Sequence, residues 1–296
     1  MLTVSVIIVN WNTGDLLKDC LSSIPAGMED LPFEVIVVDN ASQDGSAALV
    51  KENFHTVRLL MNTENKGFAH ACNQGAELAG GEYLFFLNPD TILQAGSVKR
   101  LVEFAPTCSW LGAVGPRLIG RRGKIQNSVR NLPRMKDILV RDTMIKLISP
   151  SKGKARLVSS LPSDRPSRVE QVSGAAFLIP RFLWQKLGAM DERFFTFYEE
   201  VDLCRRIRDM GYEIYYLPIA EVIHTGGGGR HQDRARTFFH SVNSMLLYLK
   251  KYEPAYKLFC FKLIYKPLFL VQILFQVNDK AKRDFIKKWL IEFVKS

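Results

Sequence analysis

The stretch LFFLNPDT, residues 84–91, decides the fold that we expect for this chain. Four apolar residues run straight into Asn88, Pro89 and Asp90, which is typical of a buried strand that ends at a carboxylate. Upstream, segments of helical spacing alternate with three further strand candidates, residues 3–11, 33–38 and 57–62. This alternation predicts an α/β fold with a mostly parallel sheet and right-handed crossovers.

The residues that follow the predicted strands indicate where a ligand would bind. Ligands of parallel sheets bind beyond the carboxyl ends of the strands. In this chain those ends carry Asn10–Asn12, Asp39–Asn40, Asn62 and Asn88–Asp90. Because polar loops are common at strand ends in general, this pattern alone leaves two interpretations open, a nucleotide site and ordinary turns.

The net charge of +10 is distributed unevenly along the chain. Residues 1–116 carry a net charge of −7 and residues 169–229 carry −3, whereas residues 117–168 carry +11 and residues 230–296 carry +9. A basic block is either a solvated face or a surface that meets phosphate or anionic lipid. We expect no nucleic-acid partner, because the acidic blocks hold the predicted ligand site and lack interleaved basic and aromatic residues.

The five cysteines form no CxxC pair and fit no zinc-site spacing. They indicate reduced, partly buried thiols and therefore a cytoplasmic protein. We expect no signal peptide, because the apolar start lacks a basic region and is too short to cross a bilayer.

The strand–helix series predicts an α/β domain over residues 1–229 and a helical C-terminal region over residues 230–296. Within the first, residues 117–168 are rich in Pro, Gly, Ser and basic side chains, and we interpret them as a basic, partly helical and mobile insertion. The most hydrophobic segment, residues 257–277, is interrupted by lysines and a proline, so we expect no clean transmembrane span there.

The last predicted helix, residues 279–295, has the composition of an interfacial amphipathic helix. Phe285, Trp289 and Phe293 share one side, and lysines surround the rest. This composition predicts contact with an anionic membrane surface. A helix that packs on the domain is the alternative.

Three motifs contain side chains that could carry chemistry. Asp90 is either a turn former or cap of a following helix, or a metal ligand. Glu199, Glu200 and Asp202 lie within four residues, and they are either offset by neighbouring arginines or form a general base with a carboxylate that tunes its pKa. His224 precedes four glycines, where it is either structural or placed to meet a ligand or metal.

Together these pieces resemble glycosyltransferase family 2, an inverting family with the GT-A fold, and they look most like its bacterial rhamnosyltransferases. The matching stretches, in chain order, are SVIIVNWN, VIVVDNASQDGS, NKGFAHACNQG, FLNPDT, VSGAAFLIPR, MDERFFTFYEEVDLCRRIRDMGY and VIHTGGG. They cover about residues 3–229, and their order and spacing are specific. The resemblance implies a GT-A domain, with a Rossmann-like, mostly parallel central sheet between helices, followed by a helical C-terminal extension.

The resemblance also implies a binding site for a nucleotide-sugar donor. Asp39 would hydrogen-bond the pyrimidine base, and Asn65 and Gly67 belong to the loop that closes on that base. The other donor-binding residues that the resemblance implies are Asn10, Trp11, Asn12, Asn88, Asp90, Ser173 and Gly174.

For catalysis, the resemblance implies that Glu200 is the base, with Glu199 and Asp202 as its acidic neighbours. Asp90 matches the last carboxylate of the family's metal-binding DxD motif, and His224 matches a histidine that completes the metal shell in some members. The implied cofactor is a divalent cation, Mg²⁺ or Mn²⁺. Because Asn stands in place of the first carboxylate of the motif, we expect a weaker metal site.

The implied function is the transfer of L-rhamnose from dTDP-L-rhamnose to a saccharide acceptor during synthesis of a bacterial surface polysaccharide such as O-antigen. The basic blocks and the apolar tail suggest an acceptor linked to polyprenyl diphosphate, and hence a peripheral protein on the cytoplasmic face of the cell membrane. A UDP-hexose donor is one alternative. The missing carboxylate motivates another, a non-catalytic module that binds a nucleotide sugar or a glycan.

Overall fold

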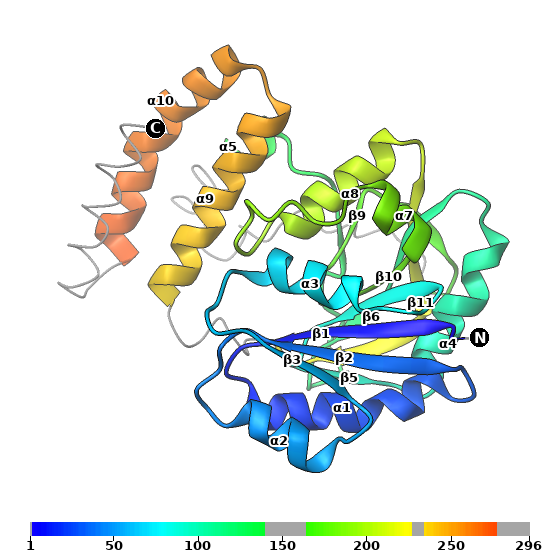
Figure 1. Ribbon diagram of the computed structural model, residues 1–296. Coiled ribbons are helices and arrows are strands. Elements are labelled where there is room, and N and C mark those ends of the chain that lie inside the picture. Colours follow the sequence, from blue (N-terminus) through cyan, green and yellow to red (C-terminus); the bar gives the residue numbers. More distant parts are fainter. Residues whose placement is uncertain (1, 140–163, 227–233, 277–296) are drawn as a thin grey trace. The chain divides into compact units, whose positions relative to one another are not determined.

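The computed structural model describes residues 2–139, 164–226 and 234–276 (Figure 1). The chain divides into two compact units. One is drawn from Met1–Leu132 and Arg156–Met245, and the other from Pro133–Ala155 and Leu246–Ser296. Every residue predicted for the ligand site belongs to the first unit.

The four strands predicted from the N-terminal part of the chain form one half of the main sheet. Their bounds are Val4–Asn10 for β1, Phe33–Asp39 for β2, Arg58–Met61 for β3 and Tyr83–Leu87 for β4. They pair in parallel in the order β3-β2-β1-β4, and the register sets Asn10 opposite Asp39. The carboxyl ends of these strands therefore meet at one edge of the sheet.

The other half of the sheet mixes strand directions. Beyond β4 the order continues β10, β6, β11 and β5, and β8 pairs with β11, which completes nine strands within the described residues. β6 and β11 are parallel, whereas β10, β5 and β8 run antiparallel to their neighbours. The bounds are Thr91–Leu93 for β5, Leu111–Ile119 for β6, Ser167–Val169 for β8, Ala176–Pro180 for β10 and Glu213–His224 for β11. The predicted α/β fold with a mostly parallel sheet is confirmed.

Helices cover both faces of the sheet (Figure 1). On one face lie α1, Gly14–Met28, α2, Ser46–Asn53, and α4, Ser97–Phe104. On the other lie α3, Phe68–Glu77, α7, Arg181–Lys186, and α8, Glu199–Asp209. A short 3-10 helix, Ala105–Thr107, follows α4, and a two-stranded sheet pairs β7, Val129–Arg130, with β9, Gln171–Val172.

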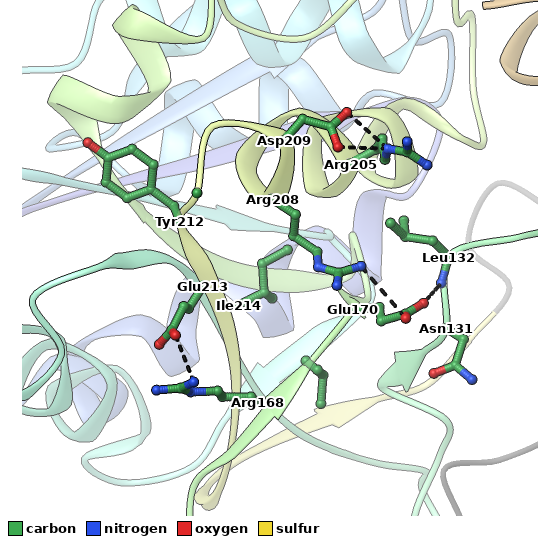
Figure 2. A pocket seen from close by; sticks show the side chains of 12 residues that line it. Asn131, Leu132, Arg168, Glu170, Arg205, Arg208, Asp209, Tyr212, Glu213 and Ile214 are labelled. Atoms are coloured by element: carbon green, nitrogen blue, oxygen red, sulfur yellow. Dashed lines mark hydrogen bonds and ion pairs between the residues drawn. The ribbon is translucent and has the colours of Figure 1, made fainter. Parts of the chain in front are cut away.

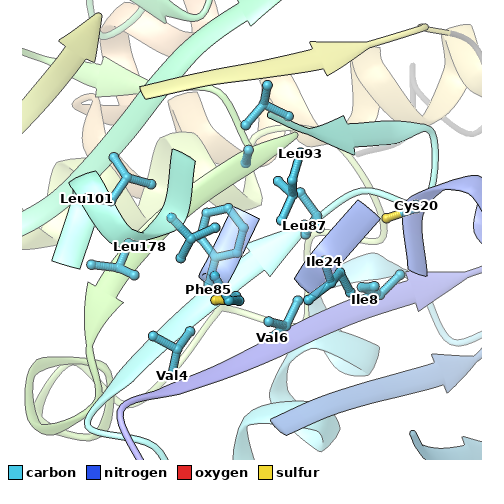
Figure 3. Packing of buried hydrophobic residues seen from close by; sticks show 14 of the residues in the cluster. Val4, Val6, Ile8, Cys20, Ile24, Phe85, Leu87, Leu93, Leu101 and Leu178 are labelled. Atoms are coloured by element: carbon cyan, nitrogen blue, oxygen red, sulfur yellow. The ribbon is translucent and has the colours of Figure 1, made fainter. Parts of the chain in front are cut away.

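The core under α1 follows from the alternation of side chains along the strands (Figure 3). Val6 and Ile8 point from β1 to the same side, where they join Phe85 of β4 and Cys20 and Ile24 of α1 in one buried cluster. Burial of each large apolar side chain contributes about 1.5–3 kcal/mol to stability. Burial also raises the pKa of the Cys20 thiol to about 12, so this thiol is an inert core residue.

The structure departs from the expected insertion at both of its ends. Arg117–Ile119 is the end of β6, and Ser167–Val169 is β8, so both ends belong to the main sheet. A short helix, α5, spans Met135–Leu139, and residues 140–163 lie outside the described residues.

The structure excludes one interpretation of Asp90. Asp90 does not cap a helix, because Thr91–Leu93 is a strand and α4 begins only at Ser97, with Gly96 at its N-cap. Thr91–Leu93 instead pairs antiparallel with the end of β11. β11 itself runs through residues 213–224, with a shift in its pairing with β6 between Leu217 and Glu221.

The predicted helical C-terminal extension is confirmed by α9, Arg234–Tyr252, and α10, Ala255–Gln276. Neither of them, nor any other helix in the described part of the chain, combines the length and apolarity that a membrane span requires. The predicted interfacial helix at residues 279–295 lies outside the described residues.

Candidate active site

A cavity of about 270 Å³ lies at the carboxyl ends of the parallel strands, and we call it the strand-end cavity. Among the predicted site residues, those that line it are Trp11, Asn65, Asn88, Asp90, Ser173, Gly174, Glu199, Glu200 and His224. Those that do not line it are Asn10, Asn12, Asp39, Gly67 and Asp202. The structure thus brings most of the predicted residues together, although they come from distant parts of the chain.

Asp39 is held in place by a buried hydrogen-bond network. The amide Nδ2 of Asn10 donates to its Oδ1 at 2.6 Å, and the backbone N–H of Ser42 donates to its Oδ2 at 3.0 Å. The same Asn10 amide also contacts the hydroxyls of Ser42 and Ser46. Asn10 is fully buried, so it orients Asp39 and is not exposed to a ligand itself.

Asn12 lies on the rim of this network. Its Oδ1 accepts a hydrogen bond from the backbone N–H of Gln43 at 2.7 Å, and its own N–H donates to Ser42 Oγ at 2.9 Å. Asn12 therefore joins the loops that follow β1 and β2. This role stabilises the edge of the site and does not place its amide in the cavity.

The loop before α3 is clamped against the loop before α8. Oδ1 of Asn65 accepts from the N–H of Gly67 at 2.9 Å, and the N–H of Phe68 donates to the carbonyl of Phe195 at 2.6 Å. Gly67 has a φ of 103°, and a Cβ there would lie 2.5 Å from the Phe195 carbonyl oxygen. Only glycine lets the backbone of this loop come so close to the Phe195 carbonyl, so the role of Gly67 is to allow this packing.

The two glutamates at the start of α8 have different surroundings. Glu199 is 6% exposed and lies beside the buried Cys72, whose pKa is raised well above its usual value by burial and further by the Glu199 carboxylate. Glu200 is less buried and packs against Gly174, where a Cβ would lie 3.4 Å from Cβ and Cγ of Glu200. Both line the cavity, and Glu200 is the better placed to meet a substrate.

The structure does not bring Asp202 to the cavity, which corrects its placement among the catalytic residues. It is fully buried, and its Oδ2 accepts a hydrogen bond from Nε of Arg206 at 2.7 Å. Arg206 also donates to the carbonyls of Leu187 and Ala189. Asp202 therefore orients a guanidinium that ties α8 to the loop after α7.

Asp90 and His224 meet at the cavity wall. Nε2 of His224 lies 3.5 Å from Oδ1 of Asp90. Asp90 is buried, and the His224 side chain is mostly buried. Gln126 contacts His224 twice, because its Oε1 lies 2.8 Å from Nδ1 and its Nε2 donates to the His224 carbonyl at 2.7 Å. With Oε1 as the acceptor, Nδ1 carries a proton, and Nε2 is the ring nitrogen that faces Asp90.

This pair fits a divalent cation only in part. No group of three or more His, Cys, Asp or Glu side chains that could hold a metal ion occurs among the described residues. A cation on Asp90 and His224 would take its remaining ligands from a diphosphate and water, which is how Mg²⁺ is commonly bound. Gln126 would then orient the histidine ligand, as hydrogen bonds to metal-bound histidines do.

Several residues in or behind the cavity wall cannot be found from the sequence. Gln126, which contacts the cavity residue His224, lies within the supposed insertion. Thr237 and His240, which line the cavity, lie on α9, beyond the predicted end of the domain. The ring of His240 stacks on Phe195 with centroids 4.3 Å apart. No motif marks these residues, because their role depends on contacts between segments far apart in the chain.

The loop that leads into α8 is backbone-strained. Phe197 and Tyr198 have φ values of 65° and 68°, in the left-handed region that bulky residues rarely adopt. Such residues cost about 1–3 kcal/mol each and persist where surrounding contacts hold them. One such contact is from α9, where Ser244 Oγ donates to the carbonyl of Thr196 at 2.8 Å. Ser244, in the middle of α9, therefore helps to fix the loop that carries the α8 glutamates.

Comparison with known proteins identifies the family. The family model described as Glycosyl transferase family 2 matches residues 5–138. N-acetylglucosaminyl-diphospho-decaprenol L-rhamnosyltransferase of Mycobacterium tuberculosis is 30% identical over 236 residues, which span 74% of this chain and 75% of that protein. This chain belongs to glycosyltransferase family 2. The predicted resemblance is confirmed, and the strand-end cavity is the candidate active site of a glycosyltransferase.

Solved structures agree with this assignment at the level of the fold. A mannosyltransferase from Pyrobaculum calidifontis, in complex with GDP-Man and Mn²⁺, has a TM-score of 0.56 at 20% identity and covers 98% of this chain and 80% of that one. GalNAc-T7 with UDP, GalNAc and Mn²⁺ has a TM-score of 0.60 at 19% identity, and the match spans 76% of this chain but only 43% of that one. The glycosyltransferase has the GT-A fold.

Proposed function

We propose that this glycosyltransferase moves L-rhamnose from dTDP-L-rhamnose to a saccharide acceptor, with inversion at the anomeric carbon. The observation that carries the proposal is the position of Glu200, which packs against Gly174 in the same cavity that Asp90 and His224 line. The same cavity thus offers a base together with groups suited to a cation with a diphosphate. The rhamnosyl donor is supported by the name of the Mycobacterium tuberculosis relative.

In the proposed reaction, Glu200 accepts the proton of the acceptor hydroxyl as its oxygen forms a bond to the anomeric carbon. The bond from that carbon to the nucleoside diphosphate breaks in the same displacement, so the anomeric configuration inverts. Asp39, oriented by Asn10, would bind the base of the nucleotide. A divalent cation held by Asp90 and His224 would supply electrostatic stabilisation of the departing diphosphate.

A panel of nucleotide sugars tests the donor. Purified protein is incubated with a divalent cation and dTDP-L-rhamnose, or with UDP-glucose, UDP-galactose or UDP-N-acetylglucosamine, together with a lipid-linked N-acetylglucosamine acceptor. We expect a rhamnosylated product whose anomeric configuration, measured by NMR, is opposite to that of the donor. Transfer from a UDP-hexose alone would replace the rhamnosyl assignment. The absence of both sugar transfer and donor hydrolysis would favour a binding module.

We further propose that the acceptor is linked to polyprenyl diphosphate and that the protein acts at an anionic membrane surface. The name of the Mycobacterium tuberculosis relative specifies a diphospho-decaprenol acceptor. In addition, α10 exposes large apolar side chains, among them Tyr256, Phe259 and Leu263, beside Lys257 and Lys262. Exposed apolar residues at helical spacing next to lysines are suited to a membrane interface.

Sedimentation with anionic lipid vesicles tests the membrane contact. Serine substitutions at Phe259 and Leu263 should reduce the bound fraction, because they remove exposed apolar surface from α10. Phe182→Ser, at an equally exposed position on α7, is the matched control and should bind as the wild type does. Equal vesicle binding by the α10 variants and the control would contradict the proposal.

A further inference from the structure

The described residues form a second cavity apart from the strand-end cavity. A volume of about 630 Å³ lies between the later turns of α8, strand β8 and the start of β11 (Figure 2). We call it the arginine-lined cavity, after Arg168, Arg205 and Arg208. Its size is within the range of small-molecule sites, and it shares no lining residue with the strand-end cavity.

The charges of this cavity balance. Each arginine pairs with a carboxylate of the same wall, as the dashed lines in Figure 2 show. The pairs are Arg168 with Glu213 at 2.9 Å, Arg205 with Asp209 at 2.9 Å and Arg208 with Glu170 at 3.7 Å. A free anion would meet these carboxylates as well as the guanidinium groups, and an apolar ligand would meet six charged side chains. The wall suits a neutral ligand that both donates and accepts hydrogen bonds.

A group of mutually inclined aromatic rings, which we call the aromatic platform, lies at the surface beside the cavity. Tyr212 lines the cavity, and its ring lies 6.0 Å from Trp110 and 6.4 Å from Phe182. Trp110 is 62% exposed and Phe182 is 58% exposed, so neither ring is buried in the core. Nζ of Lys186 lies 5.7 Å from the centre of the Tyr212 ring. Exposed aromatic faces next to planar polar side chains can take both the C–H face and the hydroxyls of a sugar.

The arginine-lined cavity lies away from the residues that we assign to the transfer reaction. Glu200, on the first turn of α8, lines the strand-end cavity, and Arg208, on the last turns of the same helix, lines the arginine-lined cavity. At 1.5 Å per residue these two positions are about 12 Å apart along the helix. Likewise, β11 begins at this cavity with Glu213 and ends at the strand-end cavity with His224. A ligand here would not occupy the place of the reacting hydroxyl.

We propose that the arginine-lined cavity and its aromatic platform form a second binding site, for a neutral oligosaccharide. The paired charges supply donors and acceptors for sugar hydroxyls, and Tyr212 with Trp110 supplies the stacking surface. Such a site would hold part of a glycan at a distance from the catalytic cavity. The proposal rests on the chemistry of this wall alone and does not require the transfer reaction.

Saturation-transfer NMR without any nucleotide sugar tests the site. The probes are the trisaccharides of N-acetylglucosamine and of glucose, and the variants are Trp110→Ala and Tyr212→Ala. We expect at least one trisaccharide to bind the wild type and each variant to bind about tenfold more weakly, because each loses one aromatic contact. Tyr212→Phe, which keeps the ring, should bind as the wild type does, and so should Tyr256→Ala, at an exposed aromatic on α10.

Three results would overturn the proposal. The first is no binding of either trisaccharide to the wild type. The second is binding that Trp110→Ala and Tyr212→Ala leave unchanged, with thermal melting showing that both variants are folded. The third is binding that Glu200→Gln abolishes, which would place the sugar in the strand-end cavity. Failure of sugar transfer would not affect these outcomes, so this site and the proposed function fail independently.

Discussion

Replacement of Gln126 by leucine should weaken the binding of a divalent cation without unfolding the protein. The Gln126 side chain makes two hydrogen bonds to one residue, 2.8 Å to Nδ1 of His224 and 2.7 Å to its carbonyl. Together they hold the ring and its tautomer so that Nε2 faces Asp90 at 3.5 Å. Loss of a hydrogen bond that orients a metal ligand typically weakens metal affinity by about 10–100-fold. That factor corresponds to about 1.4–2.7 kcal/mol.

The assay is a calorimetric Mn²⁺ titration in the presence of saturating dTDP. Gln126→Leu should show this loss, because it removes both the acceptor for Nδ1–H and the donor to the His224 carbonyl. Gln185→Leu, at an exposed position on α7, is the matched control. Wild-type Mn²⁺ affinity in Gln126→Leu, combined with a large loss in His224→Ala, would refute the role of Gln126.

Three further predictions concern the scaffold. Gly67→Ala should lower the free energy of unfolding, measured with denaturant, by about 1–3 kcal/mol, because the new Cβ would collide with the carbonyl of Phe195. Wild-type stability in this variant would show that the loop can move to accommodate the Cβ at no cost. Phe85→Ala should lower stability by about 3–5 kcal/mol, because it leaves a cavity in the core, and a loss below about 1 kcal/mol would contradict its burial. A hydrogen bond from His70 lowers the pKa of the Glu192 carboxyl. The Glu192 carboxylate is half-exposed, so its contribution to stability is small. This contribution is present above the usual carboxyl pKa of 4.5 and is lost as the pH falls below that value. The difference in unfolding free energy between wild type and Glu192→Gln should therefore shrink from about pH 6 to about pH 3, and a constant difference would contradict this coupling.

Most of the N-terminal half of the sheet was predictable because β1, β2 and β4 are largely buried and read as apolar runs. β6 was not, because Gly112, Gly115 and Pro116 interrupt its apolar pattern and suggest a loop. The structure explains these glycines by close packing. A Cβ at Gly112 would collide with Ile207 of α8, and one at Gly115 would lie 2.8 Å from Val172 of β9.

The candidate site was predictable where residues lie in motifs and not where they depend on tertiary contacts. Asp90, Glu200 and His224 were found from the sequence, and the structure brings them to one cavity. Gln126 was hidden in a basic segment that suggested a mobile insertion, and His240 lies on a helix outside the matching stretches. Asp202 was assigned to the site because it shares a motif with Glu200, but its position on α8 directs it to Arg206 instead.

The most direct test of the proposed mechanism is the turnover of Glu200→Gln with dTDP-L-rhamnose and a lipid-linked acceptor, compared with Glu77→Gln at an exposed position on α3. The amide keeps the size of the side chain but cannot accept the proton of the acceptor hydroxyl. We predict that turnover falls by about 10²–10⁴-fold in Glu200→Gln, with donor binding retained, and stays near the wild-type value in Glu77→Gln. Near-normal turnover in folded Glu200→Gln would contradict the assignment of Glu200 as the base.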